Sequence, residues 1–573
     1  MRNYLSSILT LLICVVCPLS AESAHGVQFQ TDDAADDPTA MWVCLRDKAD
    51  GHGRRLEWPT WDKLSADAST DWPVDPSYVA RIRRHGIIVR ARSKWLNAVS
   101  VDATRQQIRW LRAQPFVRQV RPVARMVRPP LSGPQGADSG KRQAGAQDSD
   151  YGDSFQQLSR IGVTVLHNLG YRGRGVRVGL LDSGFNFQSH PAFVELRVVA
   201  TRDFINGDEI VSDERVQPLT GDETRTDQNG HGTRVLSLLA AQAEGILIGA
   251  APEADYLLAK VEDLVRELPV EEDRWIAGVE WADSLGAQVI NSSLGYTTWE
   301  DSSGYVYSDL DGRTAPSSIV AGLAVQRGIV VVSAAGNDGD KEWRYISVPA
   351  DAEEVITVGS VNVFDLEIAA SSSRGPTPDG RIKPDVVAPG ELVVVADADR
   401  GYRRIVGTSF AAPLVAGTCA LLLQIHPEWS PDEVAQALRQ TAVDLGEAGP
   451  DTDYGFGLVD AVAASGLQVA VPAESASKAP FPNPLRFSSA GGALYFPLQL
   501  SVRDDVTVYI YGLSGNKVAE LPSRRMEAGD YSSPESALRW SVPGELNSGM
   551  YIYRVSAATY SHTGKLALIR TGE

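Results

Sequence analysis

Four polar side chains stand where an apolar run of the sequence begins or ends. They are Asp182 after VRVGLL, His231 in DQNGHGTRV, Asn337 after GIVVVSAAG, and Ser409 at the start of GTSFAAPLVAGT. Taken singly, each has an ordinary explanation: a helix cap, a surface histidine, a turn, a helix end. Together they supply a hydroxyl nucleophile, a base, a carboxylate to orient that base, and an amide donor for an oxyanion. Hydrolysis of a peptide bond needs this set of groups.

A scaffold that ends several buried strands at one edge would bring these residues together. The runs VRVGLL, AQVINSSL and GIVVVSAAG are continuously apolar, which is typical of buried parallel strands. Helical patterns lie between and after them. One is SPDEVAQALRQTAVDL, where Ser430 and Glu433 predict a capping box and Pro431 fits the first helical position. The alternation predicts an α/β domain with a mostly parallel sheet over residues 151–468.

The segments on either side of this domain have other compositions. Residues 25–130 combine the strand-like runs MWVCLR and GIIVRAR with the helical pattern ATRQQIRWLRAQ, which predicts a small α+β unit. Residues 131–150 are rich in Gly, Ser, Pro and Asp and indicate a linker open to proteolysis. Residues 478–573 hold alternating apolar and polar runs separated by turn residues, and predict a β-sandwich.

The start of the chain and its cysteines bear on its destination. Residues 1–21 hold an Arg, a short apolar run and small residues at the end, which is the pattern of a signal peptide. We therefore expect export. Bulky residues before Cys14 and Cys17 argue against a lipid anchor. The two remaining cysteines, Cys44 and Cys419, are too few for a disulfide scaffold, and we expect Cys419 to act as a small buried apolar residue.

Charge is unevenly distributed along the chain. Residues 25–142 carry 20 Lys and Arg against 13 Asp and Glu, whereas the whole chain has a net charge of −18. A basic segment could bind nucleic acid, or it could pack against the acidic remainder of its own chain. The basic residues are interleaved with apolar ones, as in VARIRRHGIIVRARSKWLNAV, which favours a folded partner. We expect no nucleic-acid binding.

The motifs LDSG, NGHGT, AAGND and GTSFAAP, in this order, resemble those of the subtilase family of serine proteases. So do the intervening stretches GAAPEADYLLAKV, VINSSLG and DGRIKPDVVAPG, and the resemblance spans roughly residues 155–465. It implies a subtilisin-like α/β fold. It also implies that Ser409 is the nucleophile, His231 the base, Asp182 the group that holds the imidazole, and Asn337 the oxyanion donor. The chain order Asp, His, Ser is one of those known for this triad.

The same resemblance assigns a substrate cleft. Ser293, Leu294 and Gly295 would pair with an extended substrate backbone, as an added strand pairs with a sheet edge. The segment Ala334, Ala335 and Gly336 would border the pocket for the residue before the scissile bond. Small side chains there predict a roomy, apolar pocket with broad preference. The alternative for SSLG is a plain buried strand end.

The helix that begins near Ser409 should favour an anionic intermediate, because its first N–H groups are free and its dipole is positive there. Small residues would let this helix run through the core. We expect Pro413 to lie near the first turn, where N–H groups lack intrahelical acceptors.

The two flanking segments also resemble known parts of secreted proteins. The first resembles the propeptide of secreted bacterial subtilases, which chaperones folding, inhibits the cleft and is then removed. The alternative is a permanent accessory domain. The last segment, with PFPNPLRF, VTVYIYGLSGNKVAEL and SGMYIYRV, resembles C-terminal sorting domains of type IX secretion. A passive spacer and a carbohydrate or surface binder remain alternatives.

The sequence therefore predicts a secreted, monomeric serine endopeptidase that hydrolyses extracellular proteins through an acyl-enzyme and needs no cofactor for catalysis. The acidic loops TDQNG, GDETRTD and DTDYG could bind the structural calcium common in this family, but no ligand stands out. A processing protease with a single substrate fits equally well. The alternative from another class is a surface binding or adhesion protein whose triad cuts only its own propeptide.

Overall fold

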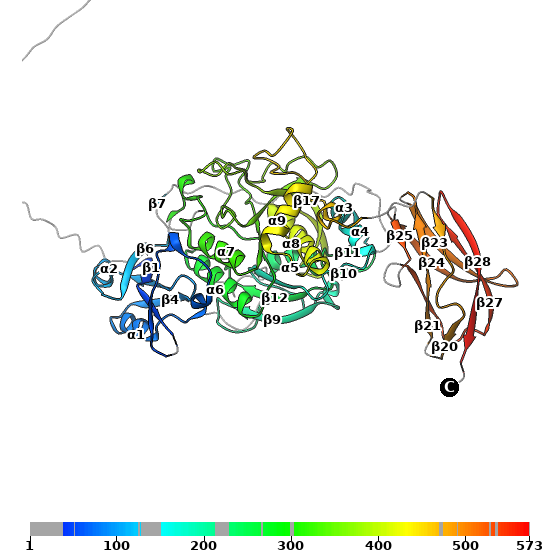
Figure 1. Cartoon of the computed structure of the whole chain (residues 1–573), viewed down its shortest axis with the longest axis horizontal. Coiled ribbons are helices and arrows are strands. Elements are labelled where there is room, and N and C mark those ends of the chain that lie inside the picture. The colour runs from blue at the N-terminus through cyan, green and yellow to red at the C-terminus, as the bar shows by residue number, and fades with distance from the viewer. Residues whose placement is uncertain are drawn as a thin grey trace, which may run out of the picture. The chain divides into compact units, whose positions relative to one another are not determined.

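The computed structural model describes residues 38–50, 52–123, 126–127, 151–212, 228–264, 268–297, 303–468, 474–489, 491–502, 504–526, 529–532 and 537–571 of the 573-residue chain (Figure 1). The predicted signal peptide at residues 1–21 and the predicted linker at residues 131–150 lie outside the described residues.

The N-terminal unit is built on a four-stranded antiparallel sheet of order β4-β5-β1-β6, drawn in blue in Figure 1. Its elements are β1 (Thr39–Leu45), β2 (Asp47–Ala49), β3 (Arg55–Glu57), α1 (Pro76–Arg84), β4 (Ile88–Ser93), β5 (Ala98–Ala103), α2 (Arg105–Arg112) and β6 (Val117–Pro122). Apolar side chains of both helices pack on one face of the sheet, with Ile82 and Leu111 against Val43 and Val101. The predicted strands MWVCLR and GIIVRAR correspond to β1 and β4, and the predicted helix ATRQQIRWLRAQ corresponds to α2.

An eight-stranded sheet of order β18-β17-β16-β15-β13-β8-β12-β9 forms the centre of the following domain. Its strands are β8 (Arg177–Asp182), β9 (Arg197–Asp203), β12 (Asp255–Lys260), β13 (Val289–Ser292), β15 (Val330–Ala334), β16 (Ile356–Asn362), β17 (Val386–Ala396) and β18 (Tyr402–Val406). Every pairing is parallel except that of β17 with β18. The prediction of an α/β fold with a mostly parallel sheet is confirmed.

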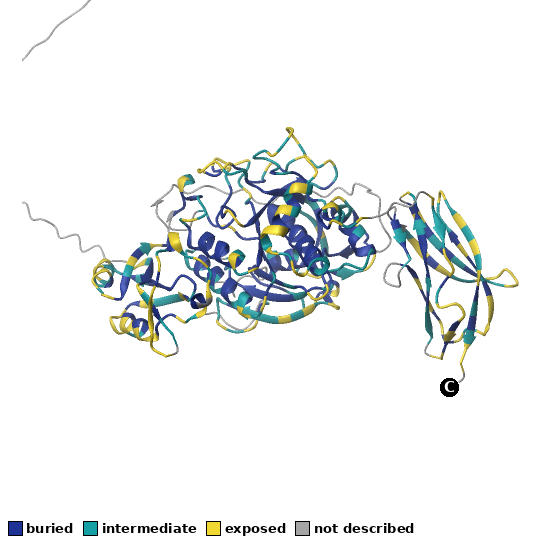
Figure 2. Ribbon diagram, in the orientation of Figure 1, coloured by how far each residue is buried: buried dark blue, intermediate teal, exposed yellow. Residues whose placement is uncertain are grey.

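Helices cover both faces of this sheet, so its central strands are buried on both sides, whereas the edge strands β9 and β18 are partly exposed (Figure 2). One apolar cluster includes α3 (Phe155–Ser159), α4 (Val163–Asn168), α5 (Gly230–Ala240), α8 (Thr408–Ile425), α9 (Pro431–Thr441) and α10 (Ala461–Ala464). The second includes α6 (Val270–Ser284) and α7 (Pro316–Gln326). Neighbouring residues of one strand serve opposite faces, as Leu180 packs in the first cluster and Leu181 in the second. Burial on two faces explains why the strand sequences are continuously apolar.

Helix α8 runs through the core, as its small and apolar sequence predicts. Its residues from Thr408 to Leu423 are buried, Cys419 among them as a free thiol. A side chain at Gly417 would overlap Ala250, so glycine is needed for this close approach. Within the described part of the chain, α8 is the one helix long and apolar enough to cross a membrane, and its burial identifies it as a core helix. The capping box of Ser430 and Glu433 at the start of α9 is confirmed.

The C-terminal residues form strands around a third apolar cluster, drawn in orange and red in Figure 1. They are β19 (Ala476–Ser477), β20 (Leu485–Phe487), β21 (Gly492–Phe496), β22 (Leu498–Leu500), β23 (Asp504–Gly512), β24 (Lys517–Met526), β25 (Gly529–Tyr531), β26 (Leu538–Val542), β27 (Gly549–Ser556) and β28 (Ser561–Arg570). They pair into sheets of five, three and two strands. Short pairs elsewhere join β10 (Gln242–Ala243) to β11 (Leu247–Ile248) and β7 (Met126–Val127) to β14 (Ser303–Gly304).

Candidate active site

Asp182 and His231 are in direct contact. Asp182 is the last residue of β8 and is fully buried, and His231 is the second residue of α5. The imidazole Nδ1 lies 2.8 Å from Asp182 Oδ1, which also accepts a hydrogen bond from the backbone N–H of Ser183. Gly232 allows α5 to approach so closely, because a Cβ there would overlap the carbonyl oxygen of Gly184 and lie 3.0 Å from Asp182 Oδ1.

The carboxylate of Asp182 changes the basicity of His231. Burial alone would lower the pKa of His231, but the negative charge and the hydrogen bond of Asp182 outweigh it. The pKa is therefore raised above the usual value for histidine. A histidine held in this way exposes its other ring nitrogen as a base once the ring is neutral.

Ser409 is the second residue of α8 and is almost fully buried. Its hydroxyl donates a hydrogen bond to the carbonyl oxygen of Ser293, at 3.0 Å. The ring of the next residue, Phe410, has its centroid 5.7 Å from that of His231, so the start of α8 lies beside the imidazole. Hydrogen bonds between a nucleophile and its base are often formed only when substrate is bound.

Pro413 does not lie where the sequence predicts it. Helix α8 begins at Thr408, so Pro413 is in the second turn, where its missing N–H would have bonded to the carbonyl of Ser409. The hydroxyl of Ser293 donates to that carbonyl instead, at 2.8 Å, and Asn291 Nδ2 donates to the same hydroxyl at 3.1 Å. Because Pro413 has no N–H, the carbonyl of Ser409 has no partner within α8, and its hydrogen bond with Ser293 joins Ser409 to the end of β13.

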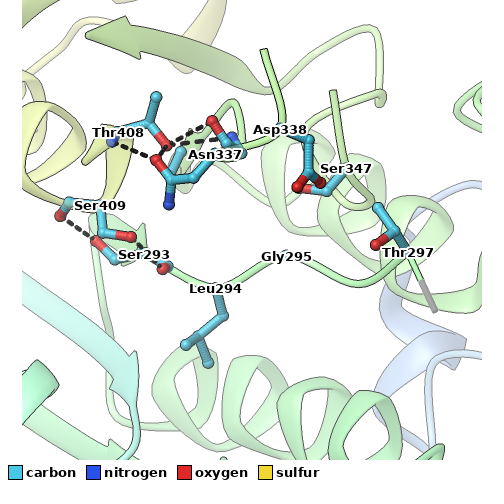
Figure 3. Close-up of a pocket in the computed structure, with 11 residues that line it drawn as sticks. Ser293, Leu294, Gly295, Thr297, Asn337, Asp338, Ser347, Thr408 and Ser409 are labelled. Carbon is cyan, nitrogen blue, oxygen red and sulfur yellow. Dashed lines mark hydrogen bonds between the residues drawn. The ribbon is translucent and has the colours of Figure 1, made fainter. Parts of the chain in front are cut away.

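The side-chain amide of Asn337 is oriented by Thr408. The backbone N–H and the hydroxyl of Thr408 both donate to Asn337 Oδ1, at 2.9 and 3.1 Å. A backbone N–H can only donate, so the oxygen of the amide must face Thr408. The NH2 group then points away from Thr408 into the pocket beside Ser409 (Figure 3). A donor held next to a nucleophile in this way can stabilise an oxyanion.

A pocket of about 200 Å³ lies between the ends of β13 and β15. Its lining is Ser293, Leu294, Gly295, Thr297, Ala334, Gly336, Asn337, Asp338, Ser347, Thr408 and Ser409. Five of the six residues predicted from the sequence to contact substrate are among them. Ala335 is not. It is fully buried and packs in the second apolar cluster, because adjacent residues at the end of a strand point to opposite faces of the sheet.

The pocket differs from the apolar one that its small wall residues predict. Thr297, Asp338 and Ser347 contribute polar side chains to the lining. The carboxylate of Asp338 pairs with Lys341 Nζ at 2.7 Å. Asp338 is the last residue of the motif AAGND, but the motif assigned it no role, and nothing in the local sequence marks Thr297 or Ser347.

The N-terminal unit packs against α6 and α7 of the central domain. The carboxylate of Glu280 accepts hydrogen bonds from the hydroxyl of Ser93 and the backbone N–H groups of Lys94 and Trp95. Arg90 pairs with the buried carboxylate of Asp273. The pair of Arg90 with Asp273 sets a basic residue of the first unit on an acidic one of the second, as the charge distribution predicts.

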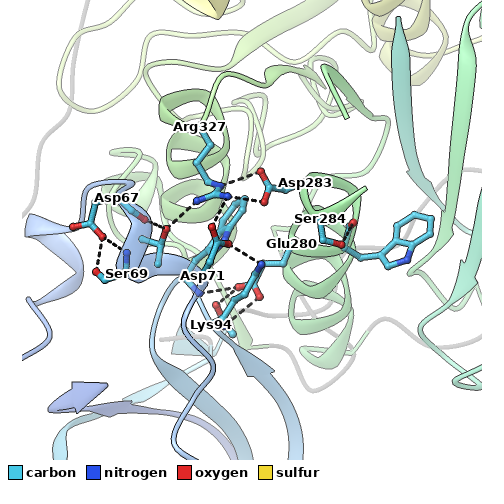
Figure 4. A network of polar contacts seen from close by, with 12 residues as sticks. Asp67, Ser69, Asp71, Lys94, Glu280, Asp283, Ser284 and Arg327 are labelled. Carbon is cyan, nitrogen blue, oxygen red and sulfur yellow. Dashed lines mark hydrogen bonds and ion pairs between the residues drawn. The ribbon is translucent and has the colours of Figure 1, made fainter. Parts of the chain in front are cut away.

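One ion pair in the same interface has the opposite polarity. Arg327 belongs to the central domain and bridges Asp71 of the N-terminal unit and Asp283 of its own domain, each at 2.9 Å (Figure 4). Apolar side chains of the N-terminal unit, Trp42 and Trp95, join the second apolar cluster of the central domain. The interface therefore combines a shared apolar core with charge pairs of both polarities.

The acidic loops proposed for calcium are only partly described. Residues 221–227 lie outside the described residues. In the loop at 451–455, Asp451 Oδ1 accepts the backbone N–H groups of Asp453 and Tyr454 within its own turn, and Asp453 pairs with Arg374. Within the described ranges, no group of three or more His, Cys, Asp or Glu is arranged to hold a metal ion.

Two protein families match this chain. Residues 173–457 match the subtilase family, and residues 61–137 match the peptidase S8 propeptide domain of Bacteroidota. Subtilisin E of Bacillus subtilis (strain 168) is 34% identical over 325 residues, which are 56% of this chain and 72% of that protein. The subtilisin of Bacillus pumilus is also 34% identical, and the match covers 100% of its length. Subtilisin Savinase of Lederbergia lenta is 32% identical over 310 residues, 54% of this chain and 97% of that protein.

Proposed function

Because this chain belongs to the subtilase family and is a serine endopeptidase with a propeptide domain, we propose that it hydrolyses extracellular proteins through Asp182, His231 and Ser409. The observation that carries this proposal is the 2.8 Å contact of His231 Nδ1 with Asp182 Oδ1, beside the helix end that holds Ser409. The alternative of a surface binding or adhesion protein that cuts only its own propeptide has no support in these similarities.

The reaction follows from the positions of these groups. His231 Nε2 takes the proton of Ser409 Oγ as the oxygen attacks the substrate carbonyl carbon, and Asp182 stabilises the imidazolium. The oxyanion is held by the NH2 group of Asn337 and by the backbone N–H of Ser409 at the positive end of α8. His231 then protonates the leaving amine, which leaves an acyl-enzyme. Water, activated by the same base, hydrolyses this ester. No step requires a cofactor, and any calcium would have a structural role.

The flanking segments have proposed roles of their own. The N-terminal unit would act as an intramolecular inhibitor and folding aid, and its interface with α6 and α7 supports this. Residues 1–21 would direct export. The C-terminal strands would form a β-sandwich, and their resemblance to type IX sorting domains supports a second export step at the outer membrane. We expect the mature enzyme to be a secreted or surface-attached monomer.

The experiment that tests the catalytic assignment compares the exported wild type with Ser409→Ala. Intact mass reports propeptide cleavage, and a fluorophosphonate probe reports an activated serine. We expect the wild type to mature and be labelled, and Ser409→Ala to do neither. Ser430→Ala, which alters the cap of α9, is the matched control and should be labelled as the wild type is. A folded wild type that is not labelled would refute the assignment of Ser409.

A further inference from the structure

Helices α1 and α2 of the N-terminal unit lie on the face of their sheet that is turned away from the central domain. Adjacent residues of β1 point to opposite faces of this sheet. Trp42 and Cys44 pack in the second apolar cluster with residues of the central domain. Val43, which lies between them, packs with Ile82 of α1 and Leu111 of α2. The docking of the unit therefore leaves the outer surface of both helices open to solvent.

The outer surface of the two helices is basic. Their sequences, PSYVARIRR and RQQIRWLR, contain no Asp or Glu. Five arginines in the last turns of these helices are exposed, and together we call them the arginine face: Arg81, Arg83, Arg84, Arg109 and Arg112.

The two helix ends that carry the arginine face lie side by side. The ring of His85, at the end of α1, stacks on the ring of Trp110 in α2, with centroids 3.9 Å apart. Arg81 Nη2 also donates a hydrogen bond to Gln114 Oε1, just after α2, at 3.2 Å. The five guanidinium groups therefore belong to one continuous surface and not to two separate helix ends.

The charge of the arginine face is not balanced by its neighbours. No member of the face makes an ion pair within the described residues. Asp75, which caps α1, pairs with Arg55. Asp102, just before α2, pairs with Arg90. A helix dipole favours cations in a last turn, but like charges three residues apart on a helix repel one another. An anionic partner would remove this repulsion.

The helix dipole does not account for all of the basic residues on this surface. Arg105 is the first residue of α2 and is exposed. A helix N-terminus disfavours a cation, so the charge of Arg105 opposes the dipole. The positive charge of this surface thus extends beyond what helix stability favours, which points to a binding role.

The partner that fits this face is a surface of lipid phosphates. Guanidinium groups pair with phosphate oxygens, and clusters of about four to eight basic residues bind anionic bilayers. Single-stranded nucleic acids are bound through exposed aromatic side chains on which bases stack. The two helices offer no such platform, because Tyr78 is buried and Trp110 packs against the apolar cluster of its own unit. An exported chain also meets membrane surfaces while its N-terminal unit is still attached.

We propose that the arginine face binds the chain to the anionic surface of a membrane, and that the chain leaves this surface when the N-terminal unit is removed. The release rests on the proposed function, because it requires cleavage by the enzyme itself. Residues 25–142 carry 20 Lys and Arg against 13 Asp and Glu, whereas the whole chain has a net charge of −18. The part that remains after cleavage is therefore strongly acidic, and anionic lipids repel it.

The test measures binding of the exported chain to lipid vesicles by flotation. Ser409→Ala is used because it should keep the N-terminal unit, and intact mass verifies that it does. Vesicles of phosphatidylcholine and phosphatidylglycerol in a two-to-one ratio are compared with vesicles of phosphatidylcholine alone. We expect binding to the anionic vesicles that weakens as salt is added, and no binding to the neutral ones. The mature wild type should bind neither.

Three arginines of the face are then neutralised together in this chain, as Arg84→Gln, Arg109→Gln and Arg112→Gln. We expect binding to anionic vesicles to weaken by about 100-fold, because each basic residue near such a surface contributes about a factor of five. Glutamine is a good helix former, so the helices should persist, and circular dichroism and thermal unfolding measure this.

The matched control neutralises three exposed arginines of the central domain, as Arg174→Gln, Arg197→Gln and Arg313→Gln. It has the same net charge as the other triple variant, but its arginine face is intact, so it should bind as tightly as Ser409→Ala alone. This control separates the effect of the face from that of the total charge.

Equal binding by the two triple variants, or equal binding to neutral and anionic vesicles, would overturn the inference. Binding of Ser409→Ala to a DNA duplex without binding to anionic vesicles would also overturn it, and would assign the arginine face to nucleic acid. Loss of the N-terminal unit from purified Ser409→Ala would contradict the proposed function instead, and vesicle binding by the uncleaved fraction would still decide the inference.

Discussion

At the scale of single residues, the site depends on how each neighbour changes the chemistry of one group. Asp182 raises the pKa of His231 against the effect of burial, and Thr408 fixes which end of the Asn337 amide faces the pocket. Both effects come mainly from contacts with a single neighbouring residue, Asp182 for the pKa of His231 and Thr408 for the amide of Asn337. They can therefore be tested by single substitutions with defined kinetic consequences.

We expect activity to rise with pH around a midpoint above the usual histidine pKa of about 6.5. At low pH His231 holds a proton and cannot accept that of Ser409, and at higher pH the neutral ring can. In Asp182→Asn the charge that raises this pKa is lost, so the midpoint of kcat/KM should move to lower pH. The rate should also fall by about 10⁴-fold, the size of effect known for such triads.

Glu262→Gln is the control for this pH profile, because Glu262 raises the pKa of His231 by its charge without the direct contact that Asp182 makes. We expect the midpoint of kcat/KM to move to lower pH by less than in Asp182→Asn, and most of the activity to remain. A wild-type profile flat from pH 5 to 8 in a steady-state peptide assay would contradict the role of His231 as base.

Asn337→Leu should lower kcat by about 10²–10³-fold with little change in KM, because the donor acts on the oxyanion and not on the bound substrate. This is the effect that loss of the corresponding donor has in subtilisin itself. Thr408→Val keeps the amide but removes one of the two hydrogen bonds that orient it, and should give a smaller loss. A raised KM with an unchanged kcat would assign Asn337 to substrate binding instead.

At the scale of elements, four ends meet at the site: the carboxyl ends of β8 and β13 and the first turns of α5 and α8. The approach of α5 to β8 depends on Gly232, and that of α8 to the segment after β11 depends on Gly417. Two helix N-termini brought to one sheet edge give free N–H groups and positive dipole ends at the place where negative charge develops.

Gly232→Ala should move the first turn of α5 away from β8, because the new Cβ would overlap the carbonyl oxygen of Gly184. A displacement of about 1 Å at a catalytic group costs about 10²-fold in rate, and we expect a loss of that order in kcat. Gly230→Ala, in the same turn, is the matched control. Its Cβ would meet only the flexible side chain of Arg234, at 3.5 Å, so activity should remain. Similar activities in the two variants would contradict this account of the helix.

At the scale of the whole molecule, the described residues form four apolar clusters: two in the central domain, one in the N-terminal unit and one among the C-terminal strands. The N-terminal unit shares side chains with the second core of the central domain, so its docking buries both apolar and charged groups. The C-terminal strands surround a cluster of their own. The interface of the propeptide must hold it in one position and still release it after cleavage. The separate core of the C-terminal strands allows that segment to act independently of catalysis.

Glu280→Ala should weaken the hold of the cleaved propeptide, because the N–H groups of Lys94 and Trp95 would lose a charged acceptor. Hydrogen bonds to charged groups contribute about 1.5–3 kcal/mol, so we expect about 10- to 100-fold weaker retention. In the full chain, the lag before activity appears should therefore be shorter than in the wild type. Native mass spectrometry measures how much cleaved propeptide stays bound.

Arg54→Ala is the control for this experiment. Arg54 pairs only with Asp50 of its own unit, and its side chain is 79% exposed. Exposed pairs of this kind contribute little, so the lag should not change. An unchanged lag in Glu280→Ala as well would mean that the apolar contacts alone retain the propeptide.

A chain that ends at residue 468 should fold, mature and cleave peptides at close to the wild-type rate, because among the described residues all members of the two cores of the catalytic region precede that point. If the C-terminal segment is a sorting domain, the same truncation in the native host should leave the enzyme in the periplasm. Cell fractionation measures this outcome. Normal release of the truncated enzyme would favour the spacer or surface-binding alternatives.

The sequence predicted Asp182, His231, Asn337 and Ser409 as a catalytic set through the resemblance of their motifs to those of subtilases. Each residue also adjoins an apolar run or a helix start, and such signals are local. The parallel sheet, the α9 capping box and the burial of α8 followed from the same local patterns. Hydrophobic periodicity and capping depend on near neighbours, so a single chain carries that information.

Only the tertiary structure shows which other residues surround these groups and fix their positions. Ser347 reaches the pocket because its strand-like segment pairs with two wall segments that lie up to 51 residues away in the sequence, at Tyr296 and Ala335. Ala335, the residue after β15, packs in the second apolar cluster because adjacent side chains at a strand end point to opposite faces of the sheet. The Ser409 carbonyl left free by Pro413 accepts the hydroxyl of Ser293. Contacts between distant segments depend on register and packing, and these are set by the whole fold and not by any local stretch of sequence.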